Sequence, residues 1–262
     1  MERDTADGRD MGRELTREVG DEPSPAVRDT APERLTPIDP NAPVSGHAVP
    51  PTAAPVVSRA PENDWPTAAE RIFPLLRPAG TAGLATADVD FATITASIRQ
   101  AHSQPIVDEG PAGLAVVYAI AASGFDVIVN ADHLVSWGVD VAAVQDTAIR
   151  NLEAWSARVP WTEESSGARR LLSSDSGDGW DATRILLPEV RAHLASELGQ
   201  MGRVLVGLPE RHLLLAGALR PGDDEFAVLF QDFVVEHSGG ADEPVDRRVF
   251  ELVDSRLVEF AG

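Results

Sequence analysis

Apolar residues in the second half of the chain recur with the spacings typical of strands and of helices. The apolar runs at 113–120 (GLAVVYAI) and 125–130 (FDVIVN) are joined by a short connection through Gly124 and predict a β-hairpin. The first run is almost wholly apolar, which favours a central position in a sheet. Similar patterns predict two later hairpins and one separate strand: 204–208 with 213–219, 248–253 with 256–260, and 169–173.

Helical spacing appears in three longer segments. From Val141 to Trp155, apolar residues recur every three or four positions behind Asp140, a suitable N-cap. Residues 178–199 predict a helix interrupted at Pro188. Residues 222–237 predict a helix whose core-facing side chains are Phe226, Leu229, Phe230, Phe233 and Val234.

Three further segments give weaker signals. Residues 67–76 predict a short helix distorted by Pro74, and 132–137 predict a helical turn capped by Asp132. Residues 88–99 fit either a strand or a helix. Because the strands come in adjacent pairs separated by single helices, we expect an α+β fold with an antiparallel or mixed sheet built from hairpins and helices on one face.

The N-terminal part has a different composition. Residues 1–64 contain no aromatic residue, and residues 1–66 hold eleven of the 20 prolines. Such a segment buries too little apolar surface to offset its backbone entropy. We therefore expect a disordered acidic tail over 1–64, which either solubilises the chain or binds a partner, and a single domain over 65–262.

Composition and charge exclude several chemistries. The chain has no cysteine, and its 22 basic residues are all arginine, so Schiff-base lysines, thiol nucleophiles and thiolate metal sites are excluded. The net charge of −20 argues against a nucleic-acid partner. With a charged N-terminus and no run of 18 apolar residues, we expect a cytoplasmic protein without a membrane span.

Several segments together resemble the YtpQ-like family of uncharacterised bacterial proteins. In order, these are IFPLLRP (72–78), VVYAI (116–120), HLVSWGV (133–139), GDGWDATRILLPE (177–189), GLPERHLLLAG (207–217) and DSRLVEF (254–260). They span most of residues 68–260 and leave the tail outside. The resemblance implies a shared fold and supports the domain boundary, but it implies no activity and no catalytic residue.

The segment 173–181 (SSDSGDGWD) is the most unusual in the chain. It fits a divalent-cation loop poorly, since glycines occupy two ligand positions of the EF-hand spacing. It also fits an anion site at a helix N-terminus poorly, because its three carboxylates would repel the anion. Helix capping explains it better, with Asp178 as N-cap and Asp181 three residues later. Arg184 then pairs with Asp181 one turn along the helix.

Two hypotheses of function follow. The first is a non-enzymatic module that binds another protein, because no set of residues meets the requirements of a catalytic site. The second is a hydrolase or transferase that uses Asp178 or Asp181 with His212 as general base, and Trp180 and Arg184 as binding residues. The second requires the 178–184 segment and the 209–212 turn to meet. No residue spacing indicates a metal site or a cofactor.

Overall fold

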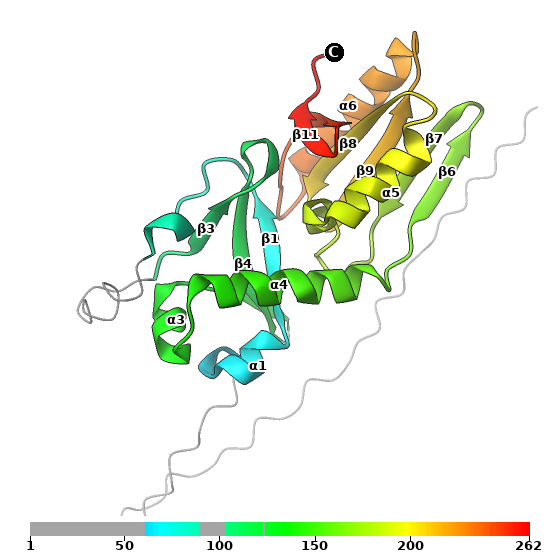
Figure 1. Ribbon diagram of the computed structural model, residues 1–262. Coiled ribbons are helices and arrows are strands. Elements are labelled where there is room, and N and C mark those ends of the chain that lie inside the picture. Colours follow the sequence, from blue (N-terminus) through cyan, green and yellow to red (C-terminus); the bar gives the residue numbers. More distant parts are fainter. Residues whose placement is uncertain (1–60, 90–102, 123) are drawn as a thin grey trace, which may run out of the picture. The chain divides into compact units, whose positions relative to one another are not determined.

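The computed structural model describes residues 61–89, 103–122 and 124–262 (Figure 1). Contacts divide the chain into two units, Met1–Ala54 and Pro55–Gly262, and the described residues all belong to the second. The predicted tail lies outside the described residues except for its last four. The predicted element at 88–99 lies outside them from residue 90 onward.

The fold is α+β, as predicted, and the strands of the described residues form two sheets. The first sheet is mixed, with strand order β1-β4-β3-β2 and with β5 also paired to β4. The second is antiparallel, with order β11-β10-β8-β9-β7-β6.

The elements of the first part of the domain are η1 (Pro61–Asn63), α1 (Trp65–Ala69), β1 (Ile72–Arg77), β2 (Leu84–Ala85), η2 (Thr86–Asp88), β3 (Ile106–Glu109), η3 (Pro111–Gly113), β4 (Ala115–Ala122), β5 (Phe125–Ile128), α3 (Ala131–Trp137) and α4 (Val141–Ser156). Those of the second part are β6 (Thr162–Ser166), β7 (Arg169–Ser174), η4 (Ala182–Leu186), α5 (Pro188–Leu198), β8 (Arg203–Glu210), β9 (Leu213–Leu219), α6 (Asp224–Gly240), β10 (Val249–Val253) and β11 (Arg256–Glu259).

The helix predicted at 67–76 is wrong in its second half, which is strand β1. Pro74 pairs with Tyr118 of β4, and among the described residues β1 has a neighbouring strand on that side alone. An edge strand tolerates proline because a missing N–H on its open side breaks no ladder. On the open side of β1, away from β4, the N–H of Leu76 donates to the hydroxyl of Thr183 in η4 at 3.3 Å.

The predicted hairpin of β4 and β5 is confirmed, and two capped helices follow it. Asn130, not Asp132, caps α3: its side chain accepts from the N–H of His133, whose Nδ1 accepts from the N–H of Asn130. This reciprocal arrangement satisfies two amides that the helix leaves free. Asp140 caps α4 as predicted, accepting from Ala143 at 2.9 Å.

The six-stranded sheet carries one helix on each face, whereas the prediction placed the helices on one face. Val204 and Val206 of β8 point toward the core that includes α5, while Leu205 points toward α6. In Figure 1, α5 lies in front of this sheet and α6 behind it. Its hairpins β8–β9 and β10–β11 are confirmed.

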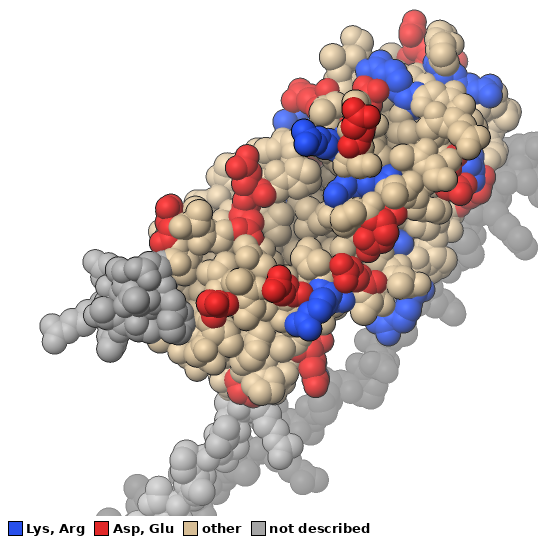
Figure 2. Space-filling view, in the orientation of Figure 1, with Lys and Arg blue, Asp and Glu red and all other residues tan. Residues whose placement is uncertain are grey.

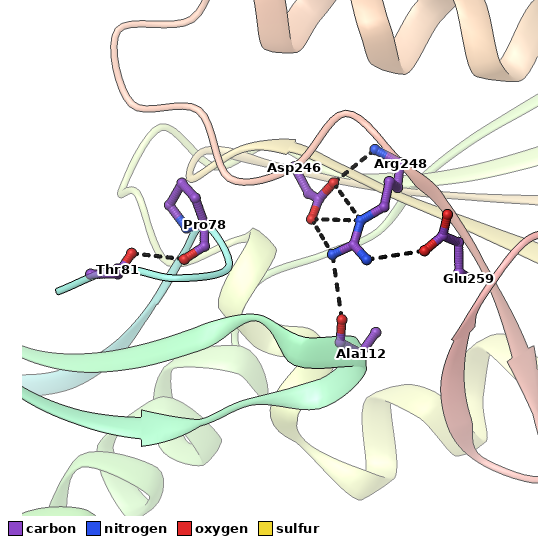
Figure 3. A network of polar contacts seen from close by, with 6 residues as sticks. All are labelled: Pro78, Thr81, Ala112, Asp246, Arg248 and Glu259. Atoms are coloured by element: carbon purple, nitrogen blue, oxygen red, sulfur yellow. Dashed lines mark hydrogen bonds and ion pairs between the residues drawn. The ribbon is translucent and has the colours of Figure 1, made fainter. Parts of the chain in front are cut away.

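A continuous apolar core joins the elements of both sheets, and polar contacts fix their junction. Figure 3 shows Arg248 just before β10, where its guanidinium makes three hydrogen bonds to Asp246, one to Glu259 and one to the carbonyl of Ala112 in η3. The last bond, at 3.4 Å, joins the residue before β10 of the second sheet to η3, which connects β3 and β4 of the first sheet. The relative position of the sheets therefore depends on specific pairs of residues as well as on packing.

Charges are interspersed on the face that carries α4 and α5. Figure 2 shows acidic and basic side chains alternating there, without a continuous basic surface among the described residues of that face. Within the described part of the chain, no helix is long and apolar enough to cross a membrane.

Candidate functional site

The unusual segment 173–181 contributes to a buried polar cluster. Asp181 has no exposed surface. Its Oδ1 accepts from the hydroxyl of Ser174 at 2.5 Å, and its Oδ2 accepts from the hydroxyl of Ser176 at 2.7 Å. Both carboxylate oxygens are thus occupied inside the protein, which stabilises the loop and leaves Asp181 turned away from solvent.

Arg184 belongs to the same cluster and holds the end of α4. Its Nη1 donates to Ser174 at 2.6 Å, and its Nε donates to the hydroxyl of Ser156 at 3.0 Å. Its Nη2 donates to the carbonyls of Ser156 and Val159 at 3.3 and 3.2 Å, which supplies donors that the helix end lacks. The guanidinium also lies 4.2 Å from the ring centroid of Trp161.

The predicted pair of Arg184 with Asp181 takes an indirect form. Among the described residues, no ion pair joins the two side chains, and the hydroxyl of Ser174 lies between them as donor to Asp181 and acceptor from Arg184. Burial lowers the pKa of Arg184, while the charge of Asp181 opposes that shift. With 2% of its surface exposed, Arg184 anchors the fold, and it lines a small cavity of about 180 Å³ together with Trp161 and His193.

The predicted capping role of Asp178 is wrong. The helices of this region begin later, η4 at Ala182 and α5 at Pro188, and neither receives a side-chain cap. Gly177 and Gly179 have φ of 78° and 82°, so the backbone around Asp178 forms a loop that only glycine enters without strain. The exposed carboxylate of Asp178 instead accepts from the indole N–H of Trp155 at 3.0 Å.

Trp180 and Arg211 pack together where the sheets meet. Trp180 is 5% exposed; its ring stacks on Phe73 of β1 at 4.6 Å between centroids and lies beneath the guanidinium of Arg211. Arg211 forms ion pairs with Asp126 of β5 at 2.7 Å and with Glu243 at 2.6 Å. Sequence analysis did not predict this network, because its three charged members are far apart in the chain and follow no motif.

A hollow of about 820 Å³ opens above this network, and we call it the junction hollow. It is lined by Arg77, Ala121, Ala122, Gly124, Phe125, Asp126, Ile128, Trp155, Gly177, Asp178, Trp180, Arg211, His212 and Glu243. The two segments required by the enzyme hypothesis do meet here, since the N–H of Ala182 donates to the carbonyl of Arg211 at 3.1 Å. Asp178 and His212 share the wall, whereas Asp181 and Arg184 do not line it.

The charges of the junction hollow are largely paired with one another. Glu243 contacts Arg211 and also Arg77, at 3.2 Å. Burial raises the pKa of Glu243, but the hydrogen bond and charge of Arg211, together with Arg77, outweigh burial and hold the pKa below its usual value. Glu243 therefore stays ionised and is a poor proton donor. Within the described residues, no carboxylate or hydroxyl holds the ring of His212 in place, as a general base would require.

A second cavity, of about 670 Å³, lies between α6 and the β6–β7 hairpin, and we call it the α6 groove. It is lined by Glu164, Ser165, Ser166, Arg169, Leu171, Ser173, Asp175, Glu210, Leu213, Leu215, Phe226, Leu229, Phe230, Phe233 and His237. Leu229 and Phe233 were predicted to face the core, but 52% and 38% of their surfaces are exposed. Only Phe226, Phe230 and Val234 of that predicted set are buried.

The rim of the α6 groove carries acidic side chains whose charges are not compensated by ion pairs. Arg169 donates to both carboxylate oxygens of Asp223, at 3.0 and 2.6 Å, and to Glu225 at 2.8 Å, so its charge is already compensated. Glu164, Asp175 and Glu210 also line the groove, and in the described structure no ion pair reaches any of the three.

Among the described residues, no three histidine, aspartate or glutamate side chains gather closely enough to hold a metal ion. Comparisons of the chain with family models, with curated proteins and with solved structures find no match. The resemblance to the YtpQ-like family stays a prediction, and the functional argument rests on the two cavities.

Proposed function

We propose that this chain is a non-enzymatic module that binds another protein, with the α6 groove as its docking surface. The observation that carries the proposal is the exposure of Leu229 and Phe233 beside a groove whose base is apolar. A helix of a soluble domain normally turns such residues inward. A concave surface with exposed aromatic and aliphatic side chains and a polar rim is typical of a recognition site.

The junction hollow supports the alternative, a hydrolase or transferase, less well. Asp178 and His212 both line it, which favours that reading. However, Asp178 is engaged by Trp155, and Asp181 is enclosed by two serine hydroxyls. Arg211 is compensated by Asp126 and Glu243, so it adds little charge to bind a substrate anion. The network serves more directly to join the two sheets.

The test compares partner binding by the wild type and by two variants of α6. Leu229→Ser with Phe233→Ser removes the apolar wall of the groove, whereas Val228→Ser with Val235→Ser changes exposed residues of α6 that do not line it. Partners captured by each full-length protein are identified by mass spectrometry, and their binding is remeasured with purified components. We expect the first pair of changes to abolish binding and the second to preserve it.

Equal capture by the wild type and by the groove variant, with both proteins folded, would reject the α6 groove as the docking surface. Repeating the capture without residues 1–64 separates any contribution of the tail from that of the groove.

A further inference from the structure

Resting on the proposed function, we infer that the α6 groove binds a basic amphipathic helix of the partner protein. The first argument is the space available. Helix α6 packs on β8, β9 and β10, so most of β6 and β7 is left uncovered on the same face of the sheet. Two strands about 4.8 Å apart span about 10 Å, the diameter of one helix with its side chains. The uncovered strip therefore has the width of a single helix lying beside α6.

The second argument is the arrangement of apolar groups in the groove. Leu229, Phe233 and His237 follow one another at intervals of four along α6, so they form a row that runs along the helix at a small inclination to its axis. The rings of Phe233 and His237 stack with centroids 3.8 Å apart, which extends this row along the helix. Leu171 and Leu213 contribute apolar surface to the same groove. A helix with apolar residues at i, i+3 or i+4, and i+7 presents a matching stripe.

The third argument is charge. Glu164 on β6, Asp175 after β7 and Glu210 at the end of β8 line the groove, and Arg169 is compensated by its own acids. A partner helix with arginine or lysine beside its apolar stripe would place opposite charges near these carboxylates. The chain's net charge of −20 also attracts a basic segment over longer distances.

The same charges disfavour a second copy of this chain as the occupant. Another copy would bring its own excess of acids to an acidic rim. The edge strand β6 also carries Glu164, which no ion pair in the described structure reaches, and an edge charge of this kind resists pairing between identical strands. The groove thus fits a partner of opposite charge better than a copy of itself.

The test is a selection from a phage library of random 20-residue peptides on the immobilised full chain. Selections run in parallel on the wild type and on Leu229→Ser with Phe233→Ser, and enriched peptides are synthesised for fluorescence anisotropy and circular dichroism. We expect enriched peptides to be positively charged, to show helical apolar spacing and to gain helix signal on binding. Their affinity should fall at least tenfold in the groove variant and stay unchanged in Val228→Ser with Val235→Ser.

Charge reversal tests the acidic rim separately. Glu164→Arg should weaken the selected peptides about fivefold, close to the value of one surface charge pair. A peptide with its basic residues changed to glutamate should then prefer the Glu164→Arg protein to the wild type. A peptide affinity that is indifferent to Glu164 and to salt would overturn the charge argument.

The outcomes separate this inference from the proposed function. Some selected peptides could depend on Leu229 and Phe233 and yet be acidic, or have apolar residues at every second position as in a strand. Such peptides would overturn the inference of a basic helix and leave the α6 groove as the docking surface. A library that yields no groove-dependent peptide overturns both. Dimerisation in size-exclusion chromatography with light scattering, lost in the groove variant, would assign the groove to a second copy instead.

Discussion

The indole N–H of Trp155, near the end of α4, donates to the carboxylate of Asp178 at 3.0 Å. Trp155 is 7% exposed, whereas Asp178 lies at the surface, so an exposed loop supplies the acceptor for an almost buried donor. Tryptophan has a single N–H, and a buried one normally finds a partner. The loop at 177–179 is therefore tied to α4 by this bond.

We predict that Asp178→Ala lowers the free energy of unfolding by about 1 kcal/mol, because the indole N–H loses its acceptor. Asp178→Asn keeps an acceptor oxygen and should recover most of that loss. Urea unfolding of Asp178→Ala, Trp155→Phe and the double variant measures the coupling. Strictly additive effects of the two changes would show that the bond contributes nothing.

A second prediction concerns the surface on which α6 rests. An added Cβ would lie 2.5 Å from Cγ2 of Val234 at Gly207, and 2.7 Å from the ring of Phe226 at Gly217. Alanine at either position must push α6 away from the sheet, which we expect to cost about 1–3 kcal/mol. Thermal and urea unfolding measure the loss.

Helix α6 also offers the matched control. A Cβ at Gly239 or Gly240 meets no atom within 4 Å, so alanine there should stabilise the helix by up to about 1 kcal/mol. Destabilisation at all four glycines alike would mean that helix packing on the sheet is not what restricts Gly207 and Gly217.

The local patterns predicted three hairpins and helices α4 and α6 well, because alternation and capping are encoded by neighbouring residues. The hairpin of β4 and β5 and the Asp140 cap are examples. The patterns missed β6, the partner of β7, and they began the 178–199 helix ten residues before α5. The segment at 72–77 was mistaken for a helix because a short apolar run fits both structures. What makes it a strand is its pairing with β4, about 40 residues away.

The errors at the candidate sites have the same origin. The apolar residues of α6 extend around much of its circumference, and the position of the helix over β8, β9 and β10 decides that Phe230 is buried and Phe233 is not. Likewise, the role of Arg211 depends on Asp126 and Glu243, which come from distant turns and strands. Residue spacing carries no information on such contacts.

A third prediction concerns Asp181. Asp181→Ala leaves Arg184 buried without a nearby negative charge and leaves two hydroxyl groups without their acceptor. We expect a loss of about 3 kcal/mol in urea unfolding. Asp181→Asn keeps one acceptor and should lose about 1 kcal/mol, so it remains measurable if the alanine variant does not fold. A stability equal to that of the wild type in both variants would contradict a structural role and revive Asp181 as a functional residue.

The last prediction concerns the pH dependence that His133 gives to the fold. Its Nδ1 accepts from the N–H of Asn130 at 3.2 Å, so this bond requires a neutral ring. Burial lowers the pKa of His133 below 6.5, although the charges of Glu62 and Asp132 oppose the shift. Because the folded pKa is the lower one, the unfolded chain takes up the proton first as the pH falls below 6.5. Stability is therefore full above that pH and declines down to the folded pKa.

His133→Gln should remove this part of the pH dependence, since glutamine at the same helix position can accept from Asn130 and does not titrate. We expect equal unfolding free energies at pH 7.5, within about 0.5 kcal/mol, and a smaller decline in the variant between pH 6.5 and 5. Asn130→Ala is the control: it removes one capping bond at every pH, at a cost of about 1 kcal/mol, and leaves the titration of His133 in place. If His133→Gln and the wild type decline in parallel below pH 6.5, the protonation of His133 is not linked to folding.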